Sequence, residues 1–239
     1  MFAGPSLISS TAEERRESER LLLNPATLSS RKLFYTWKRC FDFALALVML
    51  VLLFPVYLLI AILIKIDSRG SVLFVNQAVG QYGKEFRLYK FRSMHPATRS
   101  DVERADVARN MLQHTPTTVV AGKPVYKTAF AEGRITRVGR FLRRTSLDEL
   151  PQLWNILRGD ISLVGPRPSL PDEVSLYNVW QKQRLLVPQG LTGLYQVTAR
   201  NRVPIDEMIR IDLEYVRTCS VWVDLTILYK TPRAMLSGL

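Results

Sequence analysis

Cysteine and histidine are scarce in this chain. Its 239 residues include two cysteines, Cys40 and Cys219, and two histidines, His95 and His114, none of them in metal-ligand spacing. Two distant thiols do not make a disulfide scaffold, so we expect a reducing, cytoplasmic setting. We expect neither isolated histidine to be catalytic. The sequence therefore argues against a disulfide-rich fold and against a zinc site.

Acidic residues are also outnumbered. Lys and Arg exceed Asp and Glu by 33 to 21, which gives a formal net charge of +12. Such an excess favours anionic partners, namely nucleic acid, acidic lipid or phosphorylated metabolites. No zinc finger, RNA-binding signature or basic zipper is present, so a membrane-attached nucleic-acid binder has only net charge in its favour. We expect lipid and phosphate partners and no nucleic acid.

One long uncharged segment stands out near the N-terminus. Phe43–Ile64 has 22 residues without a charge, long enough to span a bilayer as a straight helix. Pro55 interrupts it and predicts a kink. Basic residues flank both ends, whereas the positive-inside rule gives a spanning helix one basic end. Each half, about a dozen residues, rises only roughly 18 Å, too short to cross. We predict a re-entrant helix–break–helix over residues 31–69, with a kinked single span as the alternative.

The regions on either side of this segment differ in character. Residues 1–30 are polar and predict a mobile or weakly helical tail, with no apolar core at the distance typical of a signal peptide. Residues 70–239 are expected to form a cytoplasmic catalytic domain. Within it, residues 93–133 predict a variable surface insertion with a short helix near 102–113.

The pattern of the larger region predicts an α+β, mostly helical fold. Ser71–Val75 and Lys84–Phe91, joined by a glycine-containing loop, predict a short β-hairpin. Two amphipathic helices close the chain, over Ile205–Val216 and Trp222–Tyr229. The aromatic and basic mixture of the last helix suits the lipid interface, with an ordinary core helix as the alternative.

Chemistry is concentrated in the stretch RRTSLDELPQLWNILRGDISLVGPRP, which begins at Arg143. Asp148 and Glu149 follow two arginines, and Arg167 stands between two prolines. A carboxylate can attack phosphorus covalently, while arginines and a divalent cation offset the negative charge. A second carboxylate can transfer a proton or hold the metal.

A structural interpretation of the same acid pair is also open. Ser146 and Glu149 fit a capping box at a helix start, where Leu150, Leu153, Trp154 and Leu157 mark one apolar face. In that case both carboxylates simply complement the helix dipole.

Several motifs recur in a fixed order. They are KRCFDF at Lys38, the proline-broken apolar segment, YKFRSM at Tyr89, the Arg143 stretch, GLTGLYQV at Gly190 and WVDLTIL at Trp222. In these motifs the chain resembles bacterial sugar transferases of the monotopic phosphoglycosyl transferase family. The resemblance covers about residues 31–239, with residues 93–133 the least typical.

The resemblance implies a fold and a reaction. It implies a re-entrant membrane helix at the bacterial inner membrane, with the catalytic domain in the cytoplasm. Such enzymes move a sugar 1-phosphate from a UDP-sugar to undecaprenyl phosphate and release UMP, which initiates exopolysaccharide, capsule, O-antigen or glycoconjugate synthesis. UDP-glucose, UDP-galactose and N-acetylated donors all stay open, as does a homo-oligomer.

The resemblance also implies residue roles. Asp148 would be the nucleophile of a phosphosugar–aspartyl intermediate, Glu149 would assist proton transfer, and both would hold Mg²⁺. Pro55 would break the membrane hairpin. Substrate and phosphate binding is implied for Lys90, Arg92, Arg143, Arg144, Arg167 and Asp224.

One position departs from the family pattern. Ala78 stands two positions before Gly80, where the family usually has a basic residue. The loss of a phosphate-facing charge there would weaken activity or alter substrate choice. Ala78 therefore motivates an alternative function, a catalytically weakened membrane scaffold of a polysaccharide assembly complex.

Overall fold

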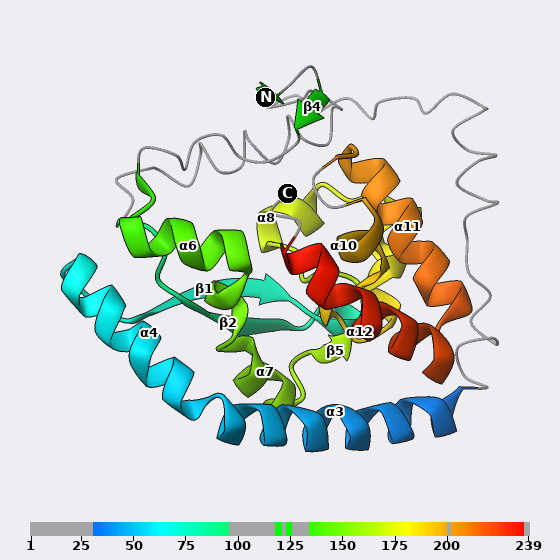
Figure 1. The fold of residues 1–239 in the computed structure, drawn as a ribbon. Helices are drawn as coiled ribbons and strands as arrows, with labels where there is room; N and C mark the ends of the chain where they lie inside the picture. Colours follow the sequence, from blue (N-terminus) through cyan, green and yellow to red (C-terminus); the bar gives the residue numbers. More distant parts are fainter. Residues whose placement is uncertain (1–30, 96–117, 121–122, 126–133, 200–201, 237–239) are drawn as a thin grey trace, which may run out of the picture.

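A computed structural model describes residues 31–95, 118–120, 123–125, 134–199 and 202–236 (Figure 1). The predicted tail and the predicted helix near residues 102–113 lie outside these ranges. The elements, in order, are α3 (Lys32–Leu52), α4 (Phe54–Asp67), β1 (Leu73–Val79), η1 (Gln81–Gly83), β2 (Glu85–Phe91), β3 (Thr118–Val120), β4 (Lys123–Val125), α6 (Arg137–Thr145), η3 (Leu147–Glu149), α7 (Gln152–Arg158), β5 (Ser162–Val164), α8 (Pro171–Ser175), α9 (Val179–Lys182), η4 (Gln183–Leu186), β6 (Gly190–Thr192), α10 (Leu194–Thr198), α11 (Ile205–Thr218) and α12 (Val221–Leu236).

Helices α3 and α4 form a bent pair along one side of the molecule (Figure 1). The bend is 61° and falls at Leu53, where the backbone leaves the helical line. Pro55 lies in the first turn of α4, where its missing N–H sacrifices no helical hydrogen bond. No single helix in the described part of the chain is long and apolar enough to cross a membrane. The two halves of the bent pair, counted together, meet the same test by length and composition only. The predicted helix–break–helix is therefore confirmed as a shape.

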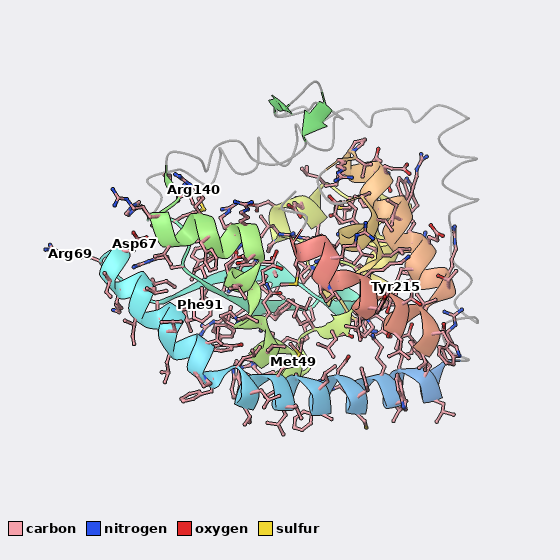
Figure 2. All side chains as sticks on the ribbon, in the orientation of Figure 1. Met49, Asp67, Arg69, Phe91, Arg140 and Tyr215 are labelled. Carbon is pink, nitrogen blue, oxygen red and sulfur yellow. The ribbon has the colours of Figure 1, made fainter. Side chains whose placement is uncertain are left out.

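The two faces of this pair are different. On α3, Lys38, Asp42 and Ala46 are buried against the rest of the protein, and on α4 Ile60 and Ile64 are buried. Many side chains project away from the protein instead (Figure 2). The exposed apolar ones are Phe43, Leu47, Val48, Val51, Leu52, Phe54, Leu58, Leu59, Ile62, Leu63 and Ile66. A continuous apolar surface of this kind indicates contact with a membrane or another protein.

Strands β1 and β2 form an antiparallel hairpin beside α4 and α6 (Figure 1). The predicted first strand was too short, because it continues through Ala78 to Val79 and leaves only residues 80–84 for the turn. Ala78 is 1% exposed and pairs with Phe86 in the main core. The expectation that position 78 faces phosphate is therefore wrong here, because the pleat directs its side chain inward.

The outer edge of β2 is covered by one side chain of α7. The Asn155 side-chain amide donates to the carbonyl of Arg87 at 2.7 Å, and its oxygen accepts from the backbone N–H of Tyr89 at 3.1 Å. One carboxamide thus satisfies the hydrogen-bonding groups that a third strand would otherwise take. This contact fixes the hairpin against α7.

The predicted helix at the acid pair is divided into two elements. Ser146 has φ of 56°, η3 follows, and α7 begins only after Pro151. The capping box was wrong, because Ser146 in this left-handed conformation makes no side-chain cap of η3. The late start also changes the helical phase, so Trp154 is 52% exposed and Ile156 enters the core in its place.

The C-terminal half packs around a parallel pair, β5 with β6, and the helices α11 and α12. The predicted helix over Ile205–Val216 is confirmed as α11. In α12 the buried positions are Asp224 and Ile227, whereas Trp222 and Tyr229 are exposed. The predicted apolar face of α12 is thus not a core face, and contact with lipid stays a prediction.

Candidate active site

The acid pair lies on η3, a short turn between α6 and α7. The left-handed Ser146 ends α6, and its carbonyl accepts from the N–H of Glu149 at 3.2 Å. Asp148 and Glu149 are both partly buried. The pair is therefore held by a tight turn rather than by a long helix, and sequence spacing alone could not show this.

The hairpin and the bent helices both reach this turn. Lys90, near the end of β2, donates to Glu149 at 2.7 Å, and each of these side chains is 20% exposed. Tyr57 of α4 donates its hydroxyl to the carbonyl of Leu150 at 2.6 Å. The candidate site is thus connected directly to the apolar helix pair.

Two arginines complete the positive surroundings. Arg143, in the last turn of α6, donates to the sulfur of Met94 at 3.0 Å, which orients its guanidinium. Arg167 has an exposed side chain between Pro166 and Pro168. The residue before this segment is Gly165. Only glycine fits there, because an added Cβ would lie 2.3 Å from the carbonyl oxygen of Pro188.

The charges of these residues act on one another. Burial raises the pKa of Asp148 above that of an ordinary aspartate, and the neighbouring Glu149 raises it further. The positive charges of Lys90, Arg143 and Arg167 lower this pKa in part. The structure therefore brings together five of the predicted site residues, two acidic and three basic.

The donor set also fits a shared cation. In the described part of the chain, no group of three or more His, Cys, Asp or Glu side chains could hold a metal ion alone. Mg²⁺ is usually bound through one or two carboxylates together with phosphate oxygens of the substrate. Asp148 and Glu149 would supply the protein's share of such a set.

Comparison with known proteins then decides the family. The sequence model described as bacterial sugar transferase matches residues 33–238. The chain belongs to the bacterial sugar transferases. It is 38% identical over 195 residues to the exopolysaccharide production protein ExoY of Sinorhizobium fredii, covering 81% of this chain and 83% of that protein.

Longer relatives are matched over part of their length. The chain is 38% identical over 217 residues to undecaprenyl-phosphate galactose phosphotransferase of Salmonella typhimurium, covering 91% of this chain and 43% of the relative. It is 37% identical over 205 residues to undecaprenyl-phosphate glucose phosphotransferase of Komagataeibacter xylinus, covering 81% and 35%. This sugar transferase therefore spans less than half the length of both.

Arg92 of this sugar transferase does not lie at the acid pair. It is buried and donates to the carbonyls of Ser68 and Arg69 and to the Ser68 hydroxyl, at 2.7 to 2.9 Å. These bonds hold the C-terminal end of α4, and the phosphate-binding role of Arg92 stays a prediction. Arg144 is exposed on α6.

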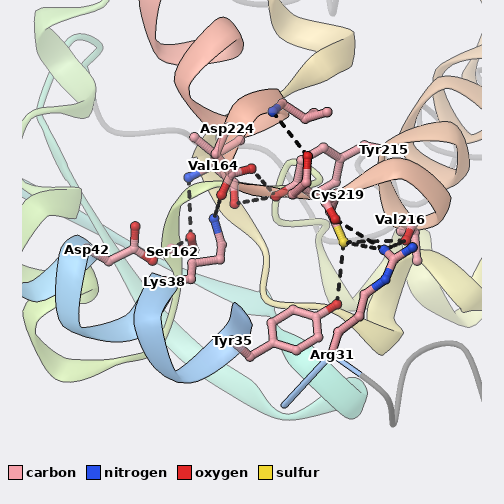
Figure 3. A network of polar contacts seen from close by, with 12 residues as sticks. Arg31, Tyr35, Lys38, Asp42, Ser162, Val164, Tyr215, Val216, Cys219 and Asp224 are labelled. Atoms are coloured by element: carbon pink, nitrogen blue, oxygen red, sulfur yellow. Dashed lines mark hydrogen bonds and ion pairs between the residues drawn. The ribbon is translucent and has the colours of Figure 1, made fainter. Parts of the chain in front are cut away.

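Asp224 likewise belongs to another part of the sugar transferase. It forms a buried ion pair with Lys38 at 2.5 Å and accepts from the Tyr215 hydroxyl at 2.8 Å (Figure 3). Ser162 donates to Asp42 nearby at 2.6 Å. These bonds fasten α3 to α11, α12 and β5, and the substrate-binding role of Asp224 stays a prediction.

Sequence reasoning did not single out several residues whose side chains hold the elements around the site together. They are Arg39, Tyr57, Asn155, Arg184 and Asp212. Each acts through a side chain that reaches a backbone or a charge far away in sequence. The only local signal was Gly159, which has φ of 84° and whose added side chain would lie 3.1 Å from Arg39.

Proposed function

We propose that this chain is a membrane phosphoglycosyl transferase that moves a sugar 1-phosphate from a UDP-sugar to undecaprenyl phosphate. The observation that carries the proposal is the acid pair on η3, surrounded by Lys90, Arg143 and Arg167 and tied through Tyr57 to the apolar helix pair. Two of these relatives are named as undecaprenyl-phosphate phosphotransferases, one for galactose and one for glucose, so the donor sugar is left to experiment.

In the first step, a carboxylate oxygen of Asp148 attacks the phosphorus that carries the sugar. A new P–O bond forms to Asp148, and the P–O bond to UMP breaks, with UMP taking the electron pair. Lys90, Arg143 and Arg167 are placed to offset the charge of the diphosphate as it approaches the carboxylate. The product is a phosphosugar–aspartyl intermediate.

In the second step, a phosphate oxygen of undecaprenyl phosphate attacks the same phosphorus. The bond to Asp148 breaks, the carboxylate is regenerated, and the lipid carries the sugar on a diphosphate. Glu149, held by Lys90, is placed to accept a proton from the incoming phosphate. When bound by the two carboxylates, Mg²⁺ would supply additional positive charge for the phosphate oxygens.

The helix pair accounts for access to the lipid substrate. Its exposed apolar face would lie among the acyl chains, with flanking basic residues toward anionic headgroups. We infer a re-entrant hairpin at the inner membrane, with residues 70–239 in the cytoplasm. Tyr57 then connects the membrane-embedded α4 to the residue after the acid pair.

The alternative is a catalytically weakened scaffold, which rested on Ala78. In this structure Ala78 is packed in the core beside Phe86, so a basic side chain is not missing from the acid pair's surroundings. The transferase therefore keeps the stronger support.

A UMP-release assay tests the proposal. Full-length protein in nanodiscs, with Mg²⁺, undecaprenyl phosphate and a panel of UDP-sugars, should release UMP with at least one donor. Binding of nucleotide sugar without release across the panel would favour the scaffold. A salt-sensitive shift with random DNA and none with nucleotide sugar would favour nucleic-acid binding.

The pH dependence should report the surroundings of Asp148. The attacking form is the carboxylate, so activity is present above the pKa of Asp148 and is lost as pH falls through it. Because burial and Glu149 raise this pKa, the acid limb of kcat/KM should lie higher than an ordinary aspartate would give. Lys90→Met removes a charge that lowers the pKa, so the limb should move to higher pH.

The control for the pH experiment is Arg140→Met, an exposed change on α6. It should leave the acid limb where it is in the wild type. An unmoved limb in Lys90→Met, with measurable turnover, would show that Lys90 does not act on the titrating group.

Replacing Pro55 should change topology. Leucine restores the backbone N–H and favours a continuous helix through the break, long enough to span. Cysteines introduced at Lys32 and Arg140, in a Cys40→Ser background, should be labelled from the same side in the parent and from opposite sides in a fraction of Pro55→Leu molecules. Leu58→Val is the matched control, and unchanged labelling in Pro55→Leu would show that Pro55 does not set topology.

A further inference from the structure

Arg184 is the largest fully buried side chain in the described part of the chain. It lies on η4, away from the acid pair in sequence, and has 0% exposure. Its Nε and Nη2 atoms donate to one oxygen of Asp212 on α11, at 3.0 and 2.5 Å. A buried guanidinium thus has a buried counter-charge.

The remaining donors of Arg184 converge on the segment that carries Arg167. Nη2 also donates to the backbone carbonyl of Arg167 at 2.8 Å, and Nη1 donates to the hydroxyls of Ser169 and Tyr177. The carbonyl of Ser169 in turn accepts from Val79 of β1 at 2.8 Å. The guanidinium of Arg184 therefore links α11 to the segment that carries Arg167. That segment is in turn bonded to the β1–β2 hairpin through Ser169.

Stability alone does not account for this arrangement. Removing two charges from water is costly, and apolar residues of similar volume are often as stabilising as a buried ion pair. Such a pair does impose one geometry, because the guanidinium fork satisfies its donors in fixed directions. Here that geometry fixes the backbone of Arg167, whose side chain is exposed and whose charge acts on Asp148.

We propose that Arg184, held by Asp212, is a positioning residue that sets where the Arg167 guanidinium meets the phosphates of the substrate. This inference rests on the proposed transferase function. Arg184 itself touches neither carboxylate of the acid pair in its hydrogen bonds, so it acts through Arg167. A displacement of about 1 Å in such a group costs up to about 100-fold in rate.

The test uses full-length protein in nanodiscs and removes both charges together. Arg184→Met with Asp212→Leu keeps apolar volume in the core and removes both members of the bonded pair, while Glu173 keeps its hydrogen bond from the Leu170 N–H, so the protein should fold. We expect kcat/KM to fall about 10- to 100-fold, mostly in kcat. Arg184→Lys keeps a charge beside Asp212 but lacks the fork, so it should show a similar loss.

Repeating the double change in a protein that already carries Arg167→Ala distinguishes loss of Arg167 positioning from a general loss of structure. In Arg167→Ala protein, the double change should cost less than about twofold more, because residues that act together are non-additive. The matched control is Lys38→Met with Asp224→Leu, which removes the buried pair under α3. Its effect should be the same with and without Arg167, and additive losses at Arg184 and Arg167 would overturn the proposal.

Hydrogen exchange gives a readout that does not need turnover. The peptide over residues 165–177 contains the hydrogen-bonded amides of Gly165, Leu170 and Val174. Its exchange should accelerate in Arg184→Met/Asp212→Leu and not in the control, while α11 stays protected. Unchanged exchange in Arg184→Met/Asp212→Leu overturns the proposal. If the wild type releases no UMP but exchange is still faster in the double variant, Arg184 and Asp212 hold the Arg167 segment and the transferase function is rejected.

Discussion

Replacing Asp148 by asparagine should reduce UMP release by at least about 10⁴-fold, because a neutral amide replaces the anionic carboxylate that attacks phosphorus in the first step. Asparagine has nearly the same volume and can occupy the partly buried position on η3 without distorting the turn. The thermal midpoint should stay close to that of the wild type. The reaction is followed by UMP release with the donor identified in the sugar panel.

Glu149→Gln is the matched control for this prediction. It removes the neighbouring carboxylate and weakens the contact with Lys90 but leaves the proposed nucleophile, so its loss should be smaller, about 10²- to 10⁴-fold. Intact-mass measurement with donor alone should reveal a sugar-phosphate adduct on wild-type protein and none on Asp148→Asn. Full activity in Asp148→Asn, or an adduct that persists in it, would assign the nucleophile to another residue.

The bent helix pair α3–α4 and the helix α11 could be predicted because their signals are local. A charge-free segment with one proline specifies two helical halves and a break, and Pro55 lies in the first turn of the second half. The apolar period over Ile205–Val216 likewise specifies α11. Both predictions needed only neighbours within a few turns.

The acid pair was found by its motif, whereas its local geometry was not predicted. The sequence pattern suggested one capped helix, but Ser146 adopts φ of 56° and Pro151 delays α7. Whether this stretch forms one capped helix or a tight turn followed by a later helix depends on the elements packed against it. Here those elements are β2, through Lys90, and α4, through Tyr57.

The buried ionic groups were beyond sequence reasoning. Lys38 and Asp224 are 186 positions apart, and Arg184 and Asp212 are 28 apart. Charged residues are expected at the surface unless they are paired, and no local pattern identifies a distant partner. Arg92 is a similar case. It lies within the motif YKFRSM, which begins at Tyr89, but it donates to backbone carbonyls at the end of α4, and no local pattern identifies that distant partner.

The ion pair under α3 gives the second large expected effect. Asp224→Asn removes the carboxylate that is bonded to the Lys38 ammonium, 3% exposed, and leaves Asp42 as the nearby acidic group. Breaking a buried pair by removing one partner costs about 3–5 kcal/mol of unfolding free energy. We therefore expect a much lower thermal midpoint in detergent, with kcat per folded molecule largely retained.

Lys38→Met combined with Asp224→Leu separates this structural role from substrate binding. Because both members of the bonded pair are removed and Asp42 keeps its hydrogen bond from Ser162, the double variant should recover most of the stability that Asp224→Asn loses. If Asp224 instead contacted the substrate, Asp224→Asn would melt near the wild-type midpoint and the double variant would stay inactive. Recovery of both stability and turnover in the double variant would establish that Asp224 fastens α3 to α11 and α12, through Lys38 and Tyr215.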